Sequence, residues 1–179
     1  MKLIKKYFAA LLAVCMLSLT ACYSNKKDYV RMDDVSSEAA QSSQTDGNFD
    51  FTSTGIDGQK VSLKDYSSAK VIMFNIWEPW CRPCRSELHD LQKLYAKYKS
   101  EGLMIVGVFS DEDGLTDIIK ENDIKYPMIR SCEAFDRFQT GYVPTTFFTD
   151  GSGKLLSDEP YVGSKSYQEW ESIILSYMK

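Results

Sequence analysis

The sequence predicts an α/β domain with a mixed β-sheet. From Phe49 onward, short apolar runs of strand length alternate with segments whose apolar residues recur at helical spacing. Two glycine-containing turns, at residues 55–58 and 150–153, separate neighbouring strand-like segments and predict hairpins. There is no internal repeat. Strands that alternate with helices, followed by a hairpin and a last helix, are typical of a single α/β domain.

The first predicted elements of the domain are a β-hairpin, a buried strand and a long helix. The hairpin consists of residues 49–54 and 59–63. Residues 70–77 form a nearly unbroken apolar run, as expected for a strand that is buried on both faces. Residues 85–98 place leucines and tyrosines on one side of a helix.

The same alternation continues to the end of the chain. The predicted elements are a buried strand at 103–109, a short helix at 115–121, a strand at 126–130, a helical turn at 133–138, a hairpin of strands 145–149 and 154–156, and an amphipathic helix at 167–178. This pattern places the folded domain at residues 49–179.

The N-terminus has the layout of a secretory signal. Three lysines precede an apolar run, residues 7–19, that is too short to span a bilayer comfortably. The run ends in Leu-Thr-Ala-Cys22, which resembles the bacterial lipobox, in which the cysteine accepts a diacylglyceryl group. We expect residues 1–21 to be a lipoprotein signal peptide. Cys22 is then expected to carry the lipid, which includes a palmitate chain, and to anchor the protein at the extracytoplasmic side of the cell membrane. An ordinary signal peptide, cut at a site that happens to contain a cysteine, is the alternative.

Residues 22–48 are predicted to be a flexible tether. They are rich in Ser, Gln and Asp, and their few apolar residues follow no sustained period. The alternative is a short structured extension that packs on the domain through Tyr29, Val30 and Met32.

The composition excludes several chemistries. The chain has five cysteines but a single histidine, His89, so a zinc site of two cysteines and two histidines is impossible, and covalent haem attachment would need a histidine where Arg85 follows Cys84. A net charge of -4 gives no support to a nucleic-acid surface. We expect no metal and no cofactor, because sulfur atoms can carry the electrons themselves, and we place His89 at the surface or in packing.

The most specific local motif is Trp80-Cys81-Arg82-Pro83-Cys84, between a predicted strand and a predicted helix. Two thiols at this spacing can close a small ring across one helical turn. Cys81 lies at the helix N-terminus, where unpaired N–H groups and the helix dipole favour its thiolate. We expect Cys84 to be more buried and to resolve the mixed disulfide that Cys81 forms with a substrate.

Residues 49–179 resemble the thioredoxin superfamily, in particular the TlpA/ResA-like branch of membrane-tethered thiol-disulfide oxidoreductases. The motifs that resemble the family are Asn75–Leu88, Tyr142–Phe147 and Asp150–Lys154. The resemblance implies a thioredoxin-like fold, with a central mixed sheet flanked by helices and an N-terminal hairpin. It also implies a redox-active disulfide between Cys81 and Cys84.

The resemblance further implies which residues contact the substrate. Val143-Pro144 matches the cis-proline loop of the family, so Pro144 is expected to bind substrate and Val143 to contact it. Trp80, with Trp77, is expected to wall the site and shape the approach of a partner, although aromatic residues here can equally be plain core.

The acid that assists the thiols is expected at an unusual place. In cytoplasmic thioredoxins a buried Asp six residues before the first cysteine accepts a proton, and here that position is Asn75, which cannot ionise. Glu87 matches an acidic residue of the membrane-tethered branch and shares a helical face with Cys84, so we expect a catalytic role in tuning the thiols or relaying a proton. The alternative is a solvated acid in the first turn. Glu78 is expected to be a solvated loop residue.

Cys132 has two interpretations. It follows a predicted parallel strand and should emerge at the same sheet edge as Cys81. The simpler interpretation is a small buried hydrophobic residue, and the alternative is a third redox thiol.

Together these features predict an extracytoplasmic, membrane-anchored and monomeric enzyme that exchanges disulfides with protein substrates. The resemblance favours the reducing direction, with a membrane electron donor that keeps the cysteines reduced. A disulfide-forming oxidase is the alternative, because Arg82 beside Cys81 stabilises the thiolate and therefore the reduced form. A thiol peroxidase is less favoured, since peroxiredoxins carry Pro and Thr upstream of a lone cysteine, whereas Trp80 and Cys84 flank Cys81 here.

Overall fold

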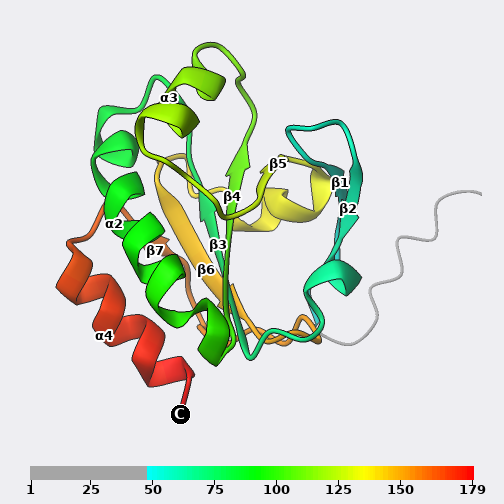
Figure 1. Ribbon diagram of the computed structural model, residues 1–179. Coiled ribbons are helices and arrows are strands. Elements are labelled where there is room, and N and C mark those ends of the chain that lie inside the picture. The colour runs from blue at the N-terminus through cyan, green and yellow to red at the C-terminus, as the bar shows by residue number, and fades with distance from the viewer. Residues whose placement is uncertain (1–47) are drawn as a thin grey trace, which may run out of the picture. The chain divides into compact units, whose positions relative to one another are not determined.

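The computed structural model describes residues 48–179 (Figure 1). The predicted signal peptide, the tether and Cys22 lie outside the described residues. Within residues 48–179, no helix has both the length and the apolar character needed to cross a bilayer.

A five-stranded mixed sheet forms the centre of the domain, in the order β5-β4-β3-β6-β7. Its strands are β3 (Val71–Ile76), β4 (Leu103–Phe109), β5 (Met128–Arg130), β6 (Thr145–Thr149) and β7 (Tyr161–Val162). β3, β4 and β5 are parallel, β6 is antiparallel to β3, and β7 is antiparallel to β6. The predicted mixed sheet is confirmed.

The predicted N-terminal hairpin is also confirmed. β1 (Thr52–Thr54) pairs antiparallel with β2 (Lys60–Ser62) in a separate sheet, and the short 3-10 helix η1 (Leu63–Tyr66) follows. The hairpin contacts the edge of the central sheet, because Ile56 N donates to Met128 O at 3.0 Å and Ser53 Oγ donates to Arg130 O at 2.5 Å.

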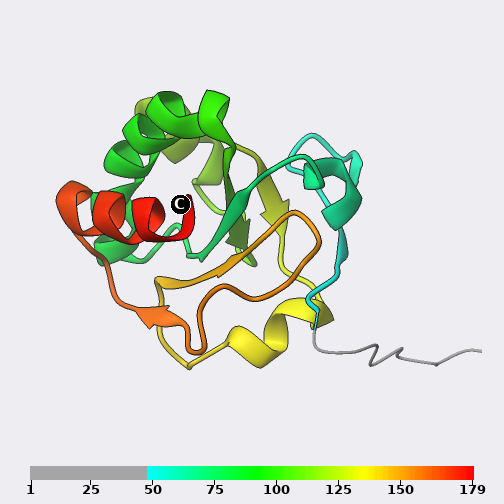
Figure 2. The ribbon, with the colours of Figure 1, turned by 90° about the horizontal axis from the view of Figure 1, so that it is seen from below.

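Helices cover one face of the sheet, and the hairpin and 3-10 turns cover the other (Figures 1 and 2). The first face carries α2 (Arg82–Tyr98), extended by η2 (Lys99–Glu101), and also α3 (Leu115–Glu121) and α4 (Tyr167–Tyr177). The second face carries η1 and η3 (Glu133–Phe138).

The alternation of side chains along β3 divides the core into two parts. Val71, Met73 and Trp77 point towards α2, whereas Ile72 and Phe74 point towards the hairpin. Every residue of β3 is buried, as expected for a central strand covered on both faces. Asn75 falls in the same alternating set as Met73, and this brings its polar side chain under α2.

Phe49 anchors the start of the domain in the second core. Its ring lies 5.1 Å from the rings of Phe74 and Phe147, edge to face with both. Its backbone N–H donates to Gly153 O at 2.7 Å, so the turn after β6 holds the segment that leads into β1. Gly153 has φ 85°, and a Cβ there would meet the Phe49 carbonyl, which leaves glycine as the residue that fits.

Two predicted boundaries are wrong. Residues 154–156 do not form a strand, since Leu155 makes only an isolated bridge to Thr149, and the strand that pairs with β6 at the sheet edge is β7 instead. β7 has only two residues, too few to produce an alternating pattern. α2 begins at Arg82 rather than at residue 85, because Cys81 caps it.

Candidate active site

The cysteine pair lies where β3 ends and α2 begins, at the carboxyl edge of the parallel strands. Cys81 is the N-cap of α2, and its sulfur accepts a hydrogen bond from Cys84 N at 3.2 Å. Pro83 lies in the first helical turn, where no backbone N–H is needed. The helix N-terminus therefore points unpaired N–H groups at the Cys81 sulfur.

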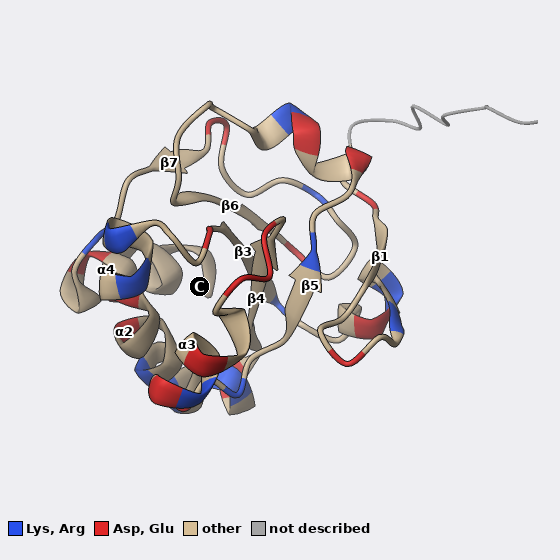
Figure 3. Ribbon diagram, turned by 90° about the horizontal axis from the view of Figure 1, so that it is seen from above, with Lys and Arg blue, Asp and Glu red and all other residues tan. Residues whose placement is uncertain are grey.

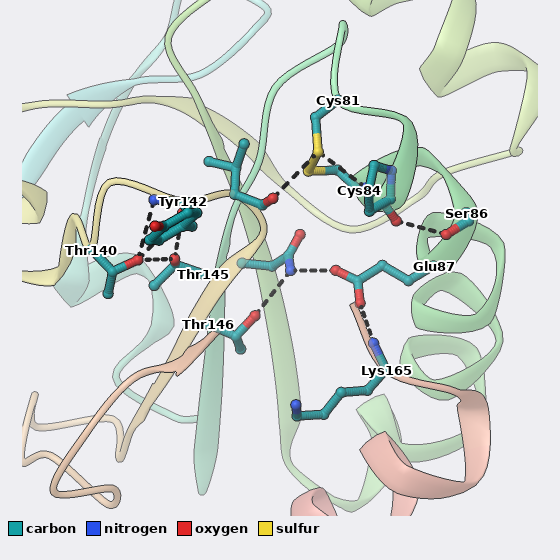
Figure 4. Close-up of a disulfide and its surroundings, with 12 residues drawn as sticks. Cys81, Cys84, Ser86, Glu87, Thr140, Tyr142, Thr145, Thr146 and Lys165 are labelled. Carbon is teal, nitrogen blue, oxygen red and sulfur yellow. Dashed lines mark hydrogen bonds between the residues drawn. A yellow bond between two sulfur atoms is a disulfide. The ribbon is translucent and has the colours of Figure 1, made fainter. Parts of the chain in front are cut away.

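The two cysteines form a disulfide across this turn (Figure 4). Their Cα atoms are 5.3 Å apart. Cys81 is 5% exposed and Cys84 is fully buried, so Cys81 is the sulfur nearer to a partner. Attack from outside the protein must therefore involve Cys81 first.

The loop before β6 packs against the disulfide. The Val143-Pro144 peptide bond is cis, and Val143 O lies 3.5 Å from Cys81 Sγ. A reduced Cys81 thiol can donate to this carbonyl oxygen. The loop is held from within, because Thr145 Oγ1 donates to Tyr142 O at 2.6 Å and bonds the Thr140 hydroxyl at 2.9 Å. Pro144 is buried and Val143 is half-buried.

Glu87 lies one turn into α2 beyond Cys84 and is only 2% exposed. Its carboxylate accepts three hydrogen bonds, from Asn75 Nδ2 at 3.0 Å, from Lys165 N at 3.1 Å and from Trp170 Nε1 at 2.9 Å. Figure 4 shows Glu87 reaching from α2 towards the segment of Lys165 that precedes α4. The hypothesis that Glu87 is a solvated acid of the first turn is wrong.

Burial raises the pKa of Glu87 above its ordinary value of 4.5, because the charged carboxylate loses water. The hydrogen bonds from Trp170, Lys165 and Asn75 act in the opposite direction, and so does the positive charge of Lys165. Loss of water is the larger effect. Glu87 is thus a carboxyl group that retains a proton more readily than an exposed glutamate does.

Asn75 positions this carboxyl group from the central strand. It is completely buried, and its Nδ2 donates both to Glu87 Oε1 and to Thr146 Oγ1, each at 3.0 Å. Thr146 is its direct neighbour across the β3–β6 pair. The amide therefore holds the acid on the helix, at the strand position where cytoplasmic thioredoxins are expected to carry the acid itself.

The expectation for Glu78 is wrong. Glu78 is 9% exposed, and its carboxylate accepts hydrogen bonds from Ser110 N at 3.1 Å and Asp111 N at 2.9 Å. Its own carbonyl accepts from Cys81 N at 3.0 Å. Glu78 thus fastens the loop before α2 to the acidic loop after β4, which Figure 3 shows in red at the same edge of the sheet. No sequence pattern indicated this role, because it depends on backbone N–H groups more than thirty residues away.

The remaining residues considered for the site fall into other roles. Cys132 is a half-buried free thiol in the core on the hairpin side of the sheet, whereas Cys81 and Cys84 belong to the core under α2. This placement favours its interpretation as a packing residue.

The two tryptophans near the motif differ: Trp77 is fully buried in the core, and Trp80 is 69% exposed. His89 is exposed on α2, as the surface interpretation predicted, and its imidazole makes no hydrogen bond within the part of the chain that the structure describes.

Metal binding has no candidate in the part of the chain that the structure describes, since residues 48–179 contain no group of three His, Cys, Asp or Glu side chains placed to hold an ion.

The burial of Glu87 predicts a pH dependence of stability in the oxidised protein. The folded-state pKa of Glu87 exceeds its ordinary value, so the folded protein binds this proton more tightly than the unfolded chain does. The free energy of unfolding is therefore expected to fall as the pH rises from the ordinary pKa of 4.5 to the raised pKa. Glu87→Gln, which cannot ionise, is expected to remove this fall. In this variant the side-chain amide of Asn75 can rotate, so that its oxygen accepts a hydrogen bond from the NH₂ group of Gln and the contact between the two residues is kept.

Urea unfolding of both proteins, from about pH 4 to about pH 8, measures the difference. Glu101→Gln, an equal change of charge at an exposed position beyond α2, serves as the control and should parallel the wild type. Identical pH profiles for the wild type and Glu87→Gln would contradict the prediction.

Comparison with known proteins agrees with this geometry. A profile of the AhpC/TSA family matches residues 46–157. The thiol-disulfide oxidoreductase ResA of a Bacillus cereus strain is 30% identical over 128 residues, which are 69% of this chain and 72% of the relative. ResA of Bacillus thuringiensis subsp. konkukian is 31% identical over 112 residues, 60% of this chain and 64% of the relative.

Solved structures show the same fold. A thiol:disulfide interchange protein of the thioredoxin family from Chlorobium tepidum superposes with a TM-score of 0.65 at 25% identity, over 74% of this chain and 96% of that chain. The paired cysteines at the start of α2, the cis-proline loop against them and the named relatives lead to one assignment. The chain belongs to the AhpC/TSA family of the thioredoxin superfamily and is a ResA-like thiol-disulfide oxidoreductase.

Proposed function

We propose that this enzyme reduces disulfides in protein substrates outside the cytoplasm while anchored to the membrane by lipid on Cys22. The observation that supports the reaction best is the Cys81–Cys84 pair, with one sulfur near the surface and the other fully buried above a buried carboxyl group. A single chain supplies both sulfurs, the cis-proline loop and Glu87, so we propose that it acts as a monomer.

The reaction proceeds by two exchanges. The Cys81 thiolate attacks one sulfur of a substrate disulfide; a Cys81–substrate bond forms, and the second substrate cysteine leaves as a thiolate that takes up a proton. Cys84 then loses its proton and attacks the Cys81 sulfur, which forms the Cys81–Cys84 disulfide and releases the first substrate cysteine. Two electrons have passed to the substrate. A dithiol electron donor in the membrane reverses both steps on the enzyme and is itself oxidised to a disulfide.

The environment of the sulfurs supports the reducing direction. Cys84 is fully buried and lies one helical turn from the Glu87 carboxyl group, and both conditions disfavour a thiolate. A destabilised thiolate destabilises the reduced enzyme, which makes the dithiol a stronger reductant. Two features of Cys81 act in the opposite direction: the N-terminus of α2, which favours its thiolate, and Arg82, whose charge is exposed and therefore screened by solvent.

The direction is tested by the reduction potential and by trapping. Equilibration with glutathione is expected to leave the pair mostly reduced only under strongly reducing conditions, as for a reductase. Cys84→Ala is expected to accumulate mixed disulfides through Cys81, which non-reducing electrophoresis and mass spectrometry detect, and Cys81→Ala should accumulate none. A pair that stays reduced in an oxidising glutathione buffer would instead identify a disulfide-forming oxidase.

We further propose that Glu87 takes the proton from Cys84 in the second exchange. A carboxyl group with a raised pKa is a better base for a thiol than an exposed carboxylate is, because the two pKa values lie closer together. Its negative charge, when present, also raises the pKa of the neighbouring thiol.

Glu87→Gln is therefore expected to lower the pKa of Cys84 in the reduced enzyme and to slow release of substrate from the mixed disulfide. The thiolate absorbance in the ultraviolet, followed against pH, reports the thiol, and stopped-flow kinetics report the release. Glu101→Gln provides the control for the change of charge. A Cys84 pKa that is the same in wild type and Glu87→Gln would rule out the tuning role.

The lipid anchor is a proposal from the sequence around Cys22. Cys22→Ser is expected to move the protein from the membrane fraction to the soluble fraction and to abolish labelling by a palmitate analogue. Cys15→Ser is a matched control, because Cys15 lies within the proposed signal peptide and would be discarded with it. Retention of the Cys22→Ser protein in the membrane with its label intact would contradict the anchor.

A further inference from the structure

Two exposed aromatic residues, Trp80 and Tyr142, are chain neighbours of the residues that surround the reactive sulfur. Tyr142 is 73% exposed and Trp80 is 69% exposed, the largest exposed fractions among the large hydrophobic side chains of residues 48–179. Trp80 immediately precedes Cys81, and Tyr142 immediately precedes Val143, whose carbonyl lies 3.5 Å from Cys81 Sγ. Trp80 and Tyr142 thus adjoin the site from two different segments of the chain.

The backbone under each ring is fixed by hydrogen bonds. Glu78 ties the segment of Trp80 to Ser110 and Asp111 and also accepts from Cys81 N. In the other segment, Tyr142 O accepts from Thr145 Oγ1 at 2.6 Å (Figure 4). Within residues 48–179, the phenol of Tyr142 makes no hydrogen bond to another side chain or to the backbone. The ring is therefore largely free to contact a partner, on a backbone that hydrogen bonds hold in place.

A rigid, exposed aromatic side chain is well suited to binding. It offers a large apolar area and loses little conformational entropy when a partner covers it. The occupant follows from the chemistry, because the substrate cysteine must bond to Cys81 and the residues beside that cysteine must then pass over the neighbours of Cys81.

We propose that Tyr142 is a specificity-determining residue which, together with Trp80, binds apolar side chains next to the reactive cysteine of the substrate polypeptide. The proposal rests on the disulfide exchange described above. Cysteine and aliphatic side chains are the types most often buried in folded proteins, so such sites are more accessible in exported chains that have not yet folded. Trp80 was expected at the substrate side from its place beside Cys81, whereas Tyr142 emerges only from its exposure and its fixed backbone.

The test compares two synthetic peptides, each with one intramolecular disulfide, that differ only in having Leu or Ser on both sides of the reactive cysteine. Rates of reduction by the reduced enzyme are divided by the rate of each peptide with dithiothreitol, which removes intrinsic differences in reactivity. The wild type is expected to prefer the Leu peptide by about tenfold, as for burial of one or two aliphatic side chains against aromatic rings.

Tyr142→Ser is expected to lose most of this preference, because the Leu peptide slows far more than the Ser peptide or glutathione disulfide does. Tyr142→Phe should keep the preference, because it keeps the ring. Leu175→Ser, at an exposed apolar position on α4, is the matched control and should behave as the wild type.

A preference that persists in Tyr142→Ser, or is absent from the wild type, would overturn the proposal. An equal slowing of glutathione disulfide and peptides would overturn it as well, because Tyr142 would then act on the reactivity of Cys81. Failure of the wild type to reduce any of these disulfides would refute the reducing function itself, which keeps the two failures distinct.

Discussion

The buried carboxyl group of Glu87 is the constraint on which the active site depends. A carboxyl group removed from water is tolerated only where its oxygens are hydrogen-bonded, and the three donors come from β3, from α4 and from the segment just before α4. These segments are far apart in the sequence. The helix that carries Cys81 and Cys84 is therefore fixed to the central strand and to the last helix through one side chain. The C-terminal helix is part of the active site for this reason, although it contributes no reacting atom.

The amide of Asn75 and the acid of Glu87 form a matched pair. An aspartate at position 75 would turn a carboxylate towards Glu87, and two like charges in a site without water would force one of them to hold a proton. An amide at this strand position donates where a carboxylate could only accept. An acid on the helix thus requires a neutral donor on the strand, and the structure satisfies both requirements with one hydrogen bond of 3.0 Å.

The sequence predicts well those elements whose structure depends on the residue pattern within the element itself. A continuous apolar run identified β3, leucines at helical spacing identified α2, and the motif placed Cys81 at the start of that helix. The missed features depend on contacts across the fold. The buried position of Glu78 depends on hydrogen bonds from backbone amides after β4, and β7 is defined only by its pairing with β6. The indole N–H of Trp170, on the apolar side of the last helix, donates to Glu87, which helical spacing does not indicate. The motif did place Glu87 beside Cys84, but its depth follows from how α4 packs against α2.

The proposed roles assign proton chemistry to a buried residue of the site and recognition to exposed ones. Glu87 accepts hydrogen bonds from Asn75 and Trp170, and its pKa depends on nearby charge and on its separation from water. Trp80 and Tyr142 are exposed to solvent, and hydrogen bonds hold the backbone segments that carry them. On these proposals, a substitution in the exposed rings changes which polypeptide Cys81 accepts and leaves the buried hydrogen bonds of Glu87 in place. Substrate preference can then diverge among enzymes of this fold while the buried half of the site stays the same.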